Sequence, residues 1–96
     1  MKNLGDINQL LKIDFPIVMA PMFLVSNIEM MKAGMRAGSM ATFPTLNYRK
    51  DAELEDVLDE LNAYQVGKPG NFGVNLIVQK TNPYYEKHLE ICVKKK

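Results

Sequence analysis

The sequence contains few of the features that mark secreted, membrane or disulfide-bonded proteins. Its single cysteine, Cys92, has no partner for a disulfide within the 96 residues, and one unpaired thiol is typical of a reducing cytoplasm. No apolar run reaches the about 20 residues that a membrane-spanning helix needs. Residues 1–6 are polar and lack the apolar segment of a signal peptide. We therefore predict a cytoplasmic protein with no membrane partner.

An excess of charge of either sign is also missing. Twelve Lys and Arg residues against eleven Asp and Glu residues give a net charge of +1. Nucleic-acid-binding proteins usually carry a clustered basic face, and the only basic run here is residues 94–96. A helix C-terminus explains that run as well, because the helix dipole favours cations there. We therefore expect no nucleic-acid partner.

Motifs for catalysis and metal binding are scarce. The only histidine, His88, lies four residues from Cys92, and one pair of this kind makes no metal site. We expect His88 to be a solvated surface residue, because it lies off the apolar stripe of its helix with Glu86, Lys87 and Glu90 around it. Gly34 and Gly38 fall at the end of a helical segment, whereas a dinucleotide fingerprint lies between a strand and a helix start. The sequence thus indicates no catalytic residue and no metal ligand.

What the sequence does contain is an alternation of strand-like and helix-like segments. Short apolar runs predict strands at residues 17–20, 39–43 and 72–78. Amphipathic segments predict helices at 6–12, 27–37, 51–65 and from Pro83 to the chain end.

Capping signals define several helix ends. Asp6 and Asp51 stand where N-caps are favoured, and Ser26 with Glu29 has the spacing of a capping box in which the serine caps the helix. Gly38 is a natural stop, because glycine tolerates the left-handed conformation. The apolar positions expected to be buried are Ile28, Met31 and Met35, then Leu54, Val57, Leu58 and Leu61, and finally Tyr85, Leu89 and Cys92.

The repeated strand–helix order predicts an α/β fold in which three consecutive βα units form a parallel sheet. The expected strands are apolar throughout, which is typical of a sheet covered on both faces. No linker divides the chain, so residues 1–96 are expected to belong to one domain.

Ligands of parallel α/β folds bind beyond the carboxyl ends of the strands. Ala20 and Pro21 at the first end would let a flat ligand approach the backbone, and Met22 offers a polarizable contact. The simpler interpretation of the pattern is a strand stop at Pro21 and a core position for Met22. Asn75, inside an apolar strand, needs partners for its amide, which either a ligand or a backbone network would supply.

Several segments together resemble one enzyme family. FPIVMAPM at residues 15–22, AGMRAGSMATF at 33–43 and FGVNLIV at 72–78 are similar to the nitronate monooxygenases, which are FMN-dependent (β/α)8-barrel enzymes. The resemblance implies that Ala20, Pro21 and Met22 lie against the flavin ring. It likewise implies that Asn75 contacts FMN. One departure is that relatives often have a glycine-rich second strand.

The same resemblance implies a partial barrel. A complete barrel needs about 250 residues, so this chain is expected to be an N-terminal part that supplies some of the FMN site. The family's catalytic histidine is expected beyond residue 96, and its role is not transferred to His88. The implied activity is the oxidation of alkyl nitronates by oxygen, for which the 96-residue chain alone is not expected to suffice.

Other assignments remain open on the sequence. The first strand is similar to that of the IMP dehydrogenase and GMP reductase group. A flavin-dependent enoyl reductase is a further alternative and is more closely related to the nitronate monooxygenases. A different class is a non-catalytic module that associates through the open edges of its sheet.

Overall fold

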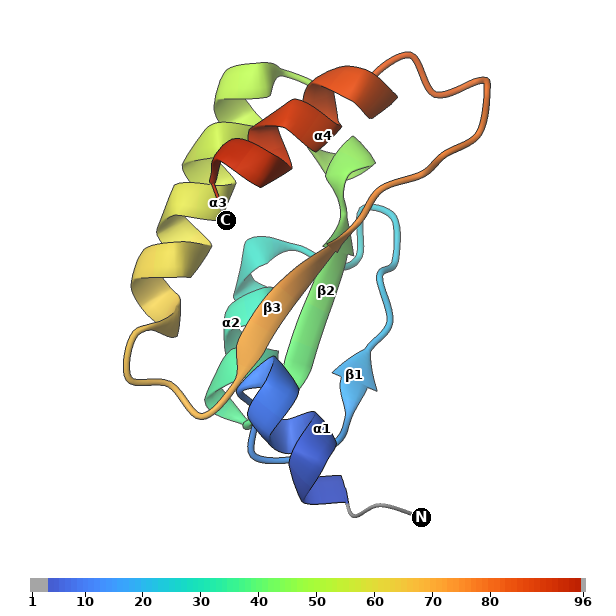
Figure 1. The fold of residues 1–96 in the computed structure, drawn as a ribbon. Helices are drawn as coiled ribbons and strands as arrows, with labels where there is room; N and C mark the ends of the chain where they lie inside the picture. The colour runs from blue at the N-terminus through green and yellow to red at the C-terminus, as the bar shows by residue number, and fades with distance from the viewer. Residues whose placement is uncertain (1–3, 96) are drawn as a thin grey trace.

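The structure, a computed structural model, describes residues 4–95 and confirms the α/β alternation (Figure 1). The helices are α1 Leu4–Leu11, α2 Ile28–Arg36, α3 Asp51–Gln65 and α4 Tyr85–Lys94, with a 3-10 turn at Thr45–Asn47. The strands are β1 Val18–Met19, β2 Met40–Pro44 and β3 Asn71–Asn75. Among these residues, no helix has the length and apolarity needed to cross a membrane.

The three strands form one parallel sheet in the order β1-β2-β3. Val18 pairs with Met40, and β2 pairs with β3 from Met40–Asn71 to Pro44–Asn75. Each new strand is therefore added on the same side of the sheet. A doubly wound sheet would instead reverse its order at a switch point.

The strand ends differ from the predictions. β1 is only two residues long, and β2 includes Pro44, which takes the last pairing position beside Asn75. β3 ends at Asn75, three residues earlier than predicted. The chain leaves the sheet there, and in the following loop the carbonyl of Ile77 accepts a hydrogen bond from Asn82 Nδ2 at 2.6 Å. Asn75 thus lies at a strand end and not inside a strand.

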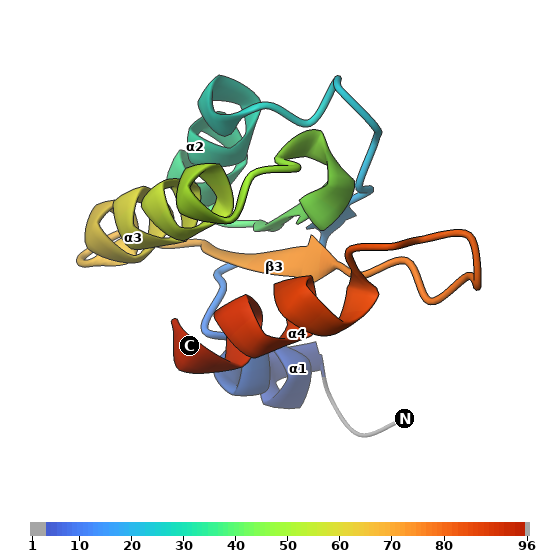
Figure 2. The same cartoon turned by 90° about the horizontal axis from the view of Figure 1, so that it is seen from above.

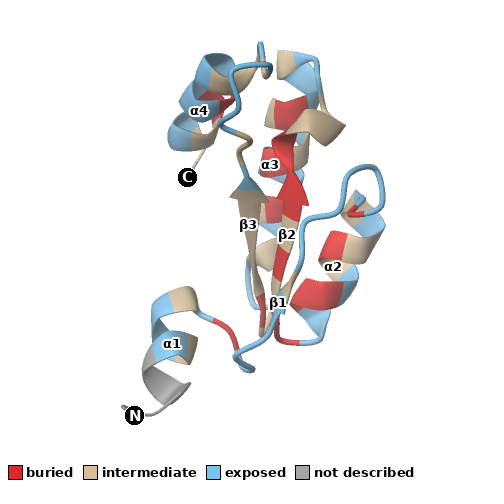
Figure 3. Ribbon diagram, turned by 90° about the vertical axis from the view of Figure 1, so that its right-hand side faces the viewer, coloured by how far each residue is buried: buried red, intermediate tan, exposed pale blue. Residues whose placement is uncertain are grey.

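One face of the sheet carries the core. Ala41 and Phe43 of β2 point to this face, where they pack with Met31 and Met35 of α2, as predicted, and with leucines of α3. The expectation that both faces are covered is wrong. On the second face Val18 is exposed, while Met40 and Thr42 are half-buried (Figure 3). Burial therefore alternates along β2 from Met40 to Phe43.

The start of α2 is capped by a different residue than predicted. Asn27 is the N-cap, and its Oδ1 accepts from the Met30 amide at 2.9 Å. Ser26 is buried in the preceding loop and forms its hydrogen bonds there. The predicted stop is confirmed, since Gly38 has φ +91° just beyond the helix.

The first helix begins at Leu4, so Asp6 lies within α1 and not at its N-cap. The end of α1 is tied to the sheet, because Asn71 Nδ2 donates to the Leu11 carbonyl at 3.1 Å. The amide of Asp14 donates to the Gly38 carbonyl at 3.0 Å. These bonds cover the end of the sheet at which the strands begin.

The last helix, α4, begins two residues later than predicted and buries a different face. His88 and Ile91 are fully buried, while Leu89 is exposed. The cause is packing of α4 against α3, with Ile91 in the shared core. Figure 2 shows α4 next to the edge strand β3, and the helix against which it packs is α3.

Candidate functional site

Three loops gather at the carboxyl edge of the sheet, because parallel strands all end on the same side. They are residues 20–27 after β1, 45–50 after β2 and 76–84 after β3. This edge is where parallel α/β folds bind ligands. It contains all four residues that the sequence analysis singled out.

The first loop exposes Ala20, Pro21 and Met22 to solvent. The interpretation of Met22 as a core residue is therefore wrong. Ser26 shapes this turn, because its Oγ accepts from the Met22 amide at 2.8 Å and donates to the Ala20 carbonyl at 3.4 Å. The amide of Met22 is thus already bonded, which leaves its thioether side chain as its group for a ligand.

Asn47 joins the first loop to the second. Its Oδ1 accepts from the Leu24 amide at 2.8 Å, and its Nδ2 donates to the Ser26 carbonyl at 3.2 Å. Leu24 has φ +62°, a left-handed conformation that costs a non-glycine residue about 1–2 kcal/mol. These bonds hold it there. No sequence signal distinguishes Asn47, because an asparagine soon after a strand is common in connecting segments.

Asn75 is exposed at the end of β3, so the expectation of a buried amide that needs partners is wrong. Within residues 4–95, no side-chain hydrogen bond involves Asn75. By strand alternation it lies on the same face as Gly73, where a Cβ added to the glycine would be nearest to the side chains of Thr42 and Met40. Adjacent strands are about 4.8 Å apart, so roughly 10 Å separate Asn75 from the line of β1. Its amide is free to meet a ligand that spans β2.

His88 is buried, which contradicts the prediction of a solvated residue. Its Nδ1 lies 2.9 Å from Thr45 Oγ1, and its ring stacks on Tyr84 with centroids 5.5 Å apart. Nε2 is buried with no hydrogen-bond partner among the described residues. Burial lowers the pKa of His88, and the nearby Asp51 carboxylate and Tyr48 carbonyl only partly oppose this effect. His88 therefore anchors α4 to the second loop in its neutral form.

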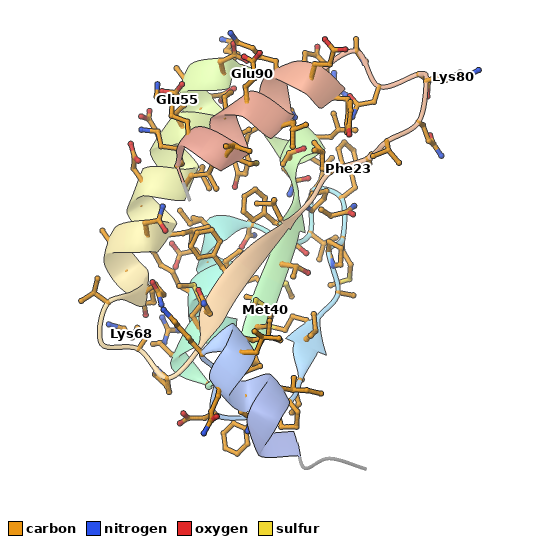
Figure 4. All side chains as sticks on the ribbon, viewed as in Figure 1. Phe23, Met40, Glu55, Lys68, Lys80 and Glu90 are labelled. Carbon is orange, nitrogen blue, oxygen red and sulfur yellow. The ribbon has the colours of Figure 1, made fainter. Side chains whose placement is uncertain are left out.

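A pocket of about 250 Å³ lies between the three loops. Its apolar walls are Phe23, Leu46, Ile77, Pro83 and Tyr84. Its polar lining consists of Arg49, Gln79, Thr81 and Asn82. Figure 4 labels Phe23 at the end of the sheet where the chain leaves β3. None of the four predicted flavin contacts lines this pocket. No sequence pattern predicts it, because its residues come from three separate loops.

A metal centre is not found in residues 4–95, where no three His, Cys, Asp or Glu side chains are grouped. Comparisons with protein-family models, curated proteins and solved structures gave no match. The assignment of a function therefore depends on the geometry of the carboxyl edge and on the resemblance of residues 15–22, 33–43 and 72–78.

Proposed function

We propose that this chain forms part of the flavin site of an FMN-dependent barrel oxidoreductase of the nitronate monooxygenase kind. The observation that carries the proposal is the exposure of Ala20–Met22 and of the unbonded Asn75 amide at one edge of a parallel sheet. The sequential strand order β1-β2-β3 also agrees with a barrel wall. We place this function in the cytoplasm because Cys92 is a free thiol.

The residues present fit a flat heterocyclic ring. Ala20 is small, and Pro21 has no backbone N–H that a ring would leave unsatisfied. Gly73 lies beside Thr42 on the neighbouring strand and two residues before Asn75, and it adds no side chain to this face. A Cβ at this position would lie 3.6 Å from Thr42 Cγ2. The second face of the sheet, on which Thr42 is half-buried, lies between the strand ends at Ala20 and Asn75.

Each proposed contact has a distinct role. The Ala20–Pro21 backbone would form a flat wall, and the Met22 thioether would pack on the ring as a polarizable surface. The Asn75 amide would both donate to and accept from the polar edge of the heterocycle. Bound FMN supplies the redox chemistry, in which an alkyl nitronate is oxidised and oxygen is reduced. No residue of this chain is assigned a catalytic role.

The test is a titration of FMN into the full chain and into its Asn75→Ala variant, with binding measured from the shifts of the amide NMR signals. We expect weak binding, on the order of millimolar, because the chain supplies few contacts. Losing one hydrogen bond of about 0.5–1.5 kcal/mol would weaken it about 2- to 12-fold. Asn62→Ala on α3, away from the three loops, is the control. Equal affinity of Asn75→Ala and the unaltered chain would reduce Asn75 to a structural residue and count against the site.

A second candidate is a module that associates with other chains through its open sheet edges. The observation that favours it is the exposure of Val18 on the short edge strand β1, with Phe15 and Ile17 also exposed just before it. Unpaired strand edges with apolar side chains invite pairing with another chain. The concentration dependence described in the Discussion tests this candidate.

A further inference from the structure

The pocket between the three loops, here named the Arg49 pocket, combines apolar walls with a single charge. Phe23, Leu46, Ile77 and Tyr84 provide aliphatic and aromatic surface from all three loops. Arg49 is the one charged residue that lines it. Small-ligand sites typically have this composition, mostly apolar with a few polar groups that fix orientation.

Arg49 takes part in no ion pair with the side chains that the structure describes. The ion pairs among residues 4–95 involve lysines only, so no carboxylate lies within 4 Å of the Arg49 guanidinium. Arg36, the only other arginine of the chain, differs because its Nη1 donates to Tyr64 Oη at 2.8 Å. A guanidinium presents a planar fork of donors that matches the oxygens of a planar oxyanion.

The pocket is held in shape before any ligand enters. Asn82 fastens the third loop, because its Nδ2 donates to the Ile77 carbonyl at 2.6 Å and its Oδ1 accepts from the Tyr84 amide at 3.0 Å. The Asn82 amide donates to the Gln79 carbonyl at 2.9 Å. Tyr84 is supported from behind by its stack on the buried His88. A preformed site loses less conformational entropy on binding.

We propose that the Arg49 pocket binds a small organic oxyanion with a short apolar tail, such as a carboxylate. Arg49 pairs with the oxygen atoms of the ligand. Phe23, Leu46 and Tyr84 cover its tail. The inference does not depend on the flavin proposal, because the pocket and the proposed flavin contacts share no residue.

The test uses butyrate as the probe and butyramide as its neutral counterpart, each titrated into the full chain at constant ionic strength. We expect saturable NMR shifts at residues 46–49 and 77–84 with butyrate and much smaller shifts with butyramide. Acetate should bind more weakly than butyrate, because it lacks the apolar tail. Equal binding of butyrate and butyramide would overturn the proposal.

Substitutions test whether Arg49 supplies the charge that binds butyrate. Arg49→Gln should weaken butyrate binding about 10- to 100-fold, since a charge-assisted hydrogen bond is lost, and Arg49→Lys should recover part of the affinity. Arg36→Gln removes the same charge elsewhere and should leave binding unchanged. Far-UV circular dichroism verifies that each variant is folded. Undiminished butyrate binding by folded Arg49→Gln would overturn the assignment, whereas loss of FMN shifts alone would affect only the flavin proposal.

Discussion

At the scale of single residues, the buried His88 makes the chain sensitive to pH. Burial lowers the pKa of His88, so the folded chain binds this proton less readily than the unfolded chain. The stability that neutral His88 contributes is therefore fully present above the unfolded pKa of about 6.5. It is lost as the pH falls from there through the folded pKa, with a slope of at most about 1.4 kcal/mol per pH unit.

Urea unfolding between pH 7.5 and 5 measures this effect. We expect the free energy of unfolding to fall as the pH is lowered below about 6.5. The chain has one histidine, so His88→Gln should be less stable at neutral pH but should show a flatter profile in this range. The same slope in both proteins would contradict the assignment to His88.

Gly70 is another residue whose role is purely local. A Cβ added there would lie 2.5 Å from the carbonyl oxygens of both Met35 and Ser39, and these are backbone atoms that cannot turn aside. We predict that Gly70→Ala destabilises the fold by about 1–3 kcal/mol in chemical denaturation.

Gly73→Ala is the matched control for this change. Its Cβ would be 3.6 Å from the nearest atom, Thr42 Cγ2, which is an ordinary contact. Stability within about 1 kcal/mol of the unaltered chain is expected for Gly73→Ala. If both alanine variants were equally stable, the close approach at Gly70 would not be a real constraint.

At the scale of elements, the start of α2 can be tested directly. Asn27 caps this helix through Met30, and no bond returns from Glu29 to the cap. Asn27→Ala should therefore cost about 1 kcal/mol, and Asn27→Ser should cost much less. Glu29→Ala should cost only a few tenths of a kcal/mol, through the helix dipole. If Glu29→Ala lost as much stability as Asn27→Ala, the result would indicate that the reciprocal capping box forms.

The sequence predicted some elements well for clear physical reasons. The leucine stripe of α3 and the Met31–Met35 stripe of α2 are strongly periodic, and these faces are buried. The face of α4 was not predictable from periodicity. His88 is polar, so the helical pattern places it outside the core. Its Nδ1 nevertheless lies within hydrogen-bonding distance of Thr45, 43 residues away, and this contact satisfies one ring nitrogen in the core. Tertiary packing decided that face.

At the scale of the whole molecule, the candidate site was predictable only in part. Parallel strands place Ala20–Met22 and Asn75 at one edge, and the alternation of elements is sufficient to expect this. The Arg49 pocket was not predictable, because it depends on loop conformations fixed by Asn47 and Asn82. Those bonds join or shape loops that no local pattern connects.

The open sheet also predicts weak stability and self-association. Three strands leave two edges, and Val18 on β1 is 56% exposed. Sedimentation velocity should show mass increasing with concentration, and thermal unfolding should begin at a low temperature. Val18→Lys should reduce the association, because a charge on an edge strand disfavours pairing.

Val66→Lys is the control for that variant, since Val66 is 75% exposed at the C-cap of α3 and lies outside the three strands. It should leave the association unchanged. A monomeric chain with a cooperative melt at high temperature would contradict the account of open edges.

We propose that the carboxyl edge between Ala20 and Asn75 is a flavin surface. Transferred nuclear Overhauser effects between FMN and the full chain test it most directly, because they report weak contacts between named atoms. We predict cross-peaks from the methyl groups of the flavin ring to the Met22 methyl group, and from the polar ring edge to the Asn75 side-chain amide. Cross-peaks confined to other surfaces, or none at millimolar FMN, would contradict the claim.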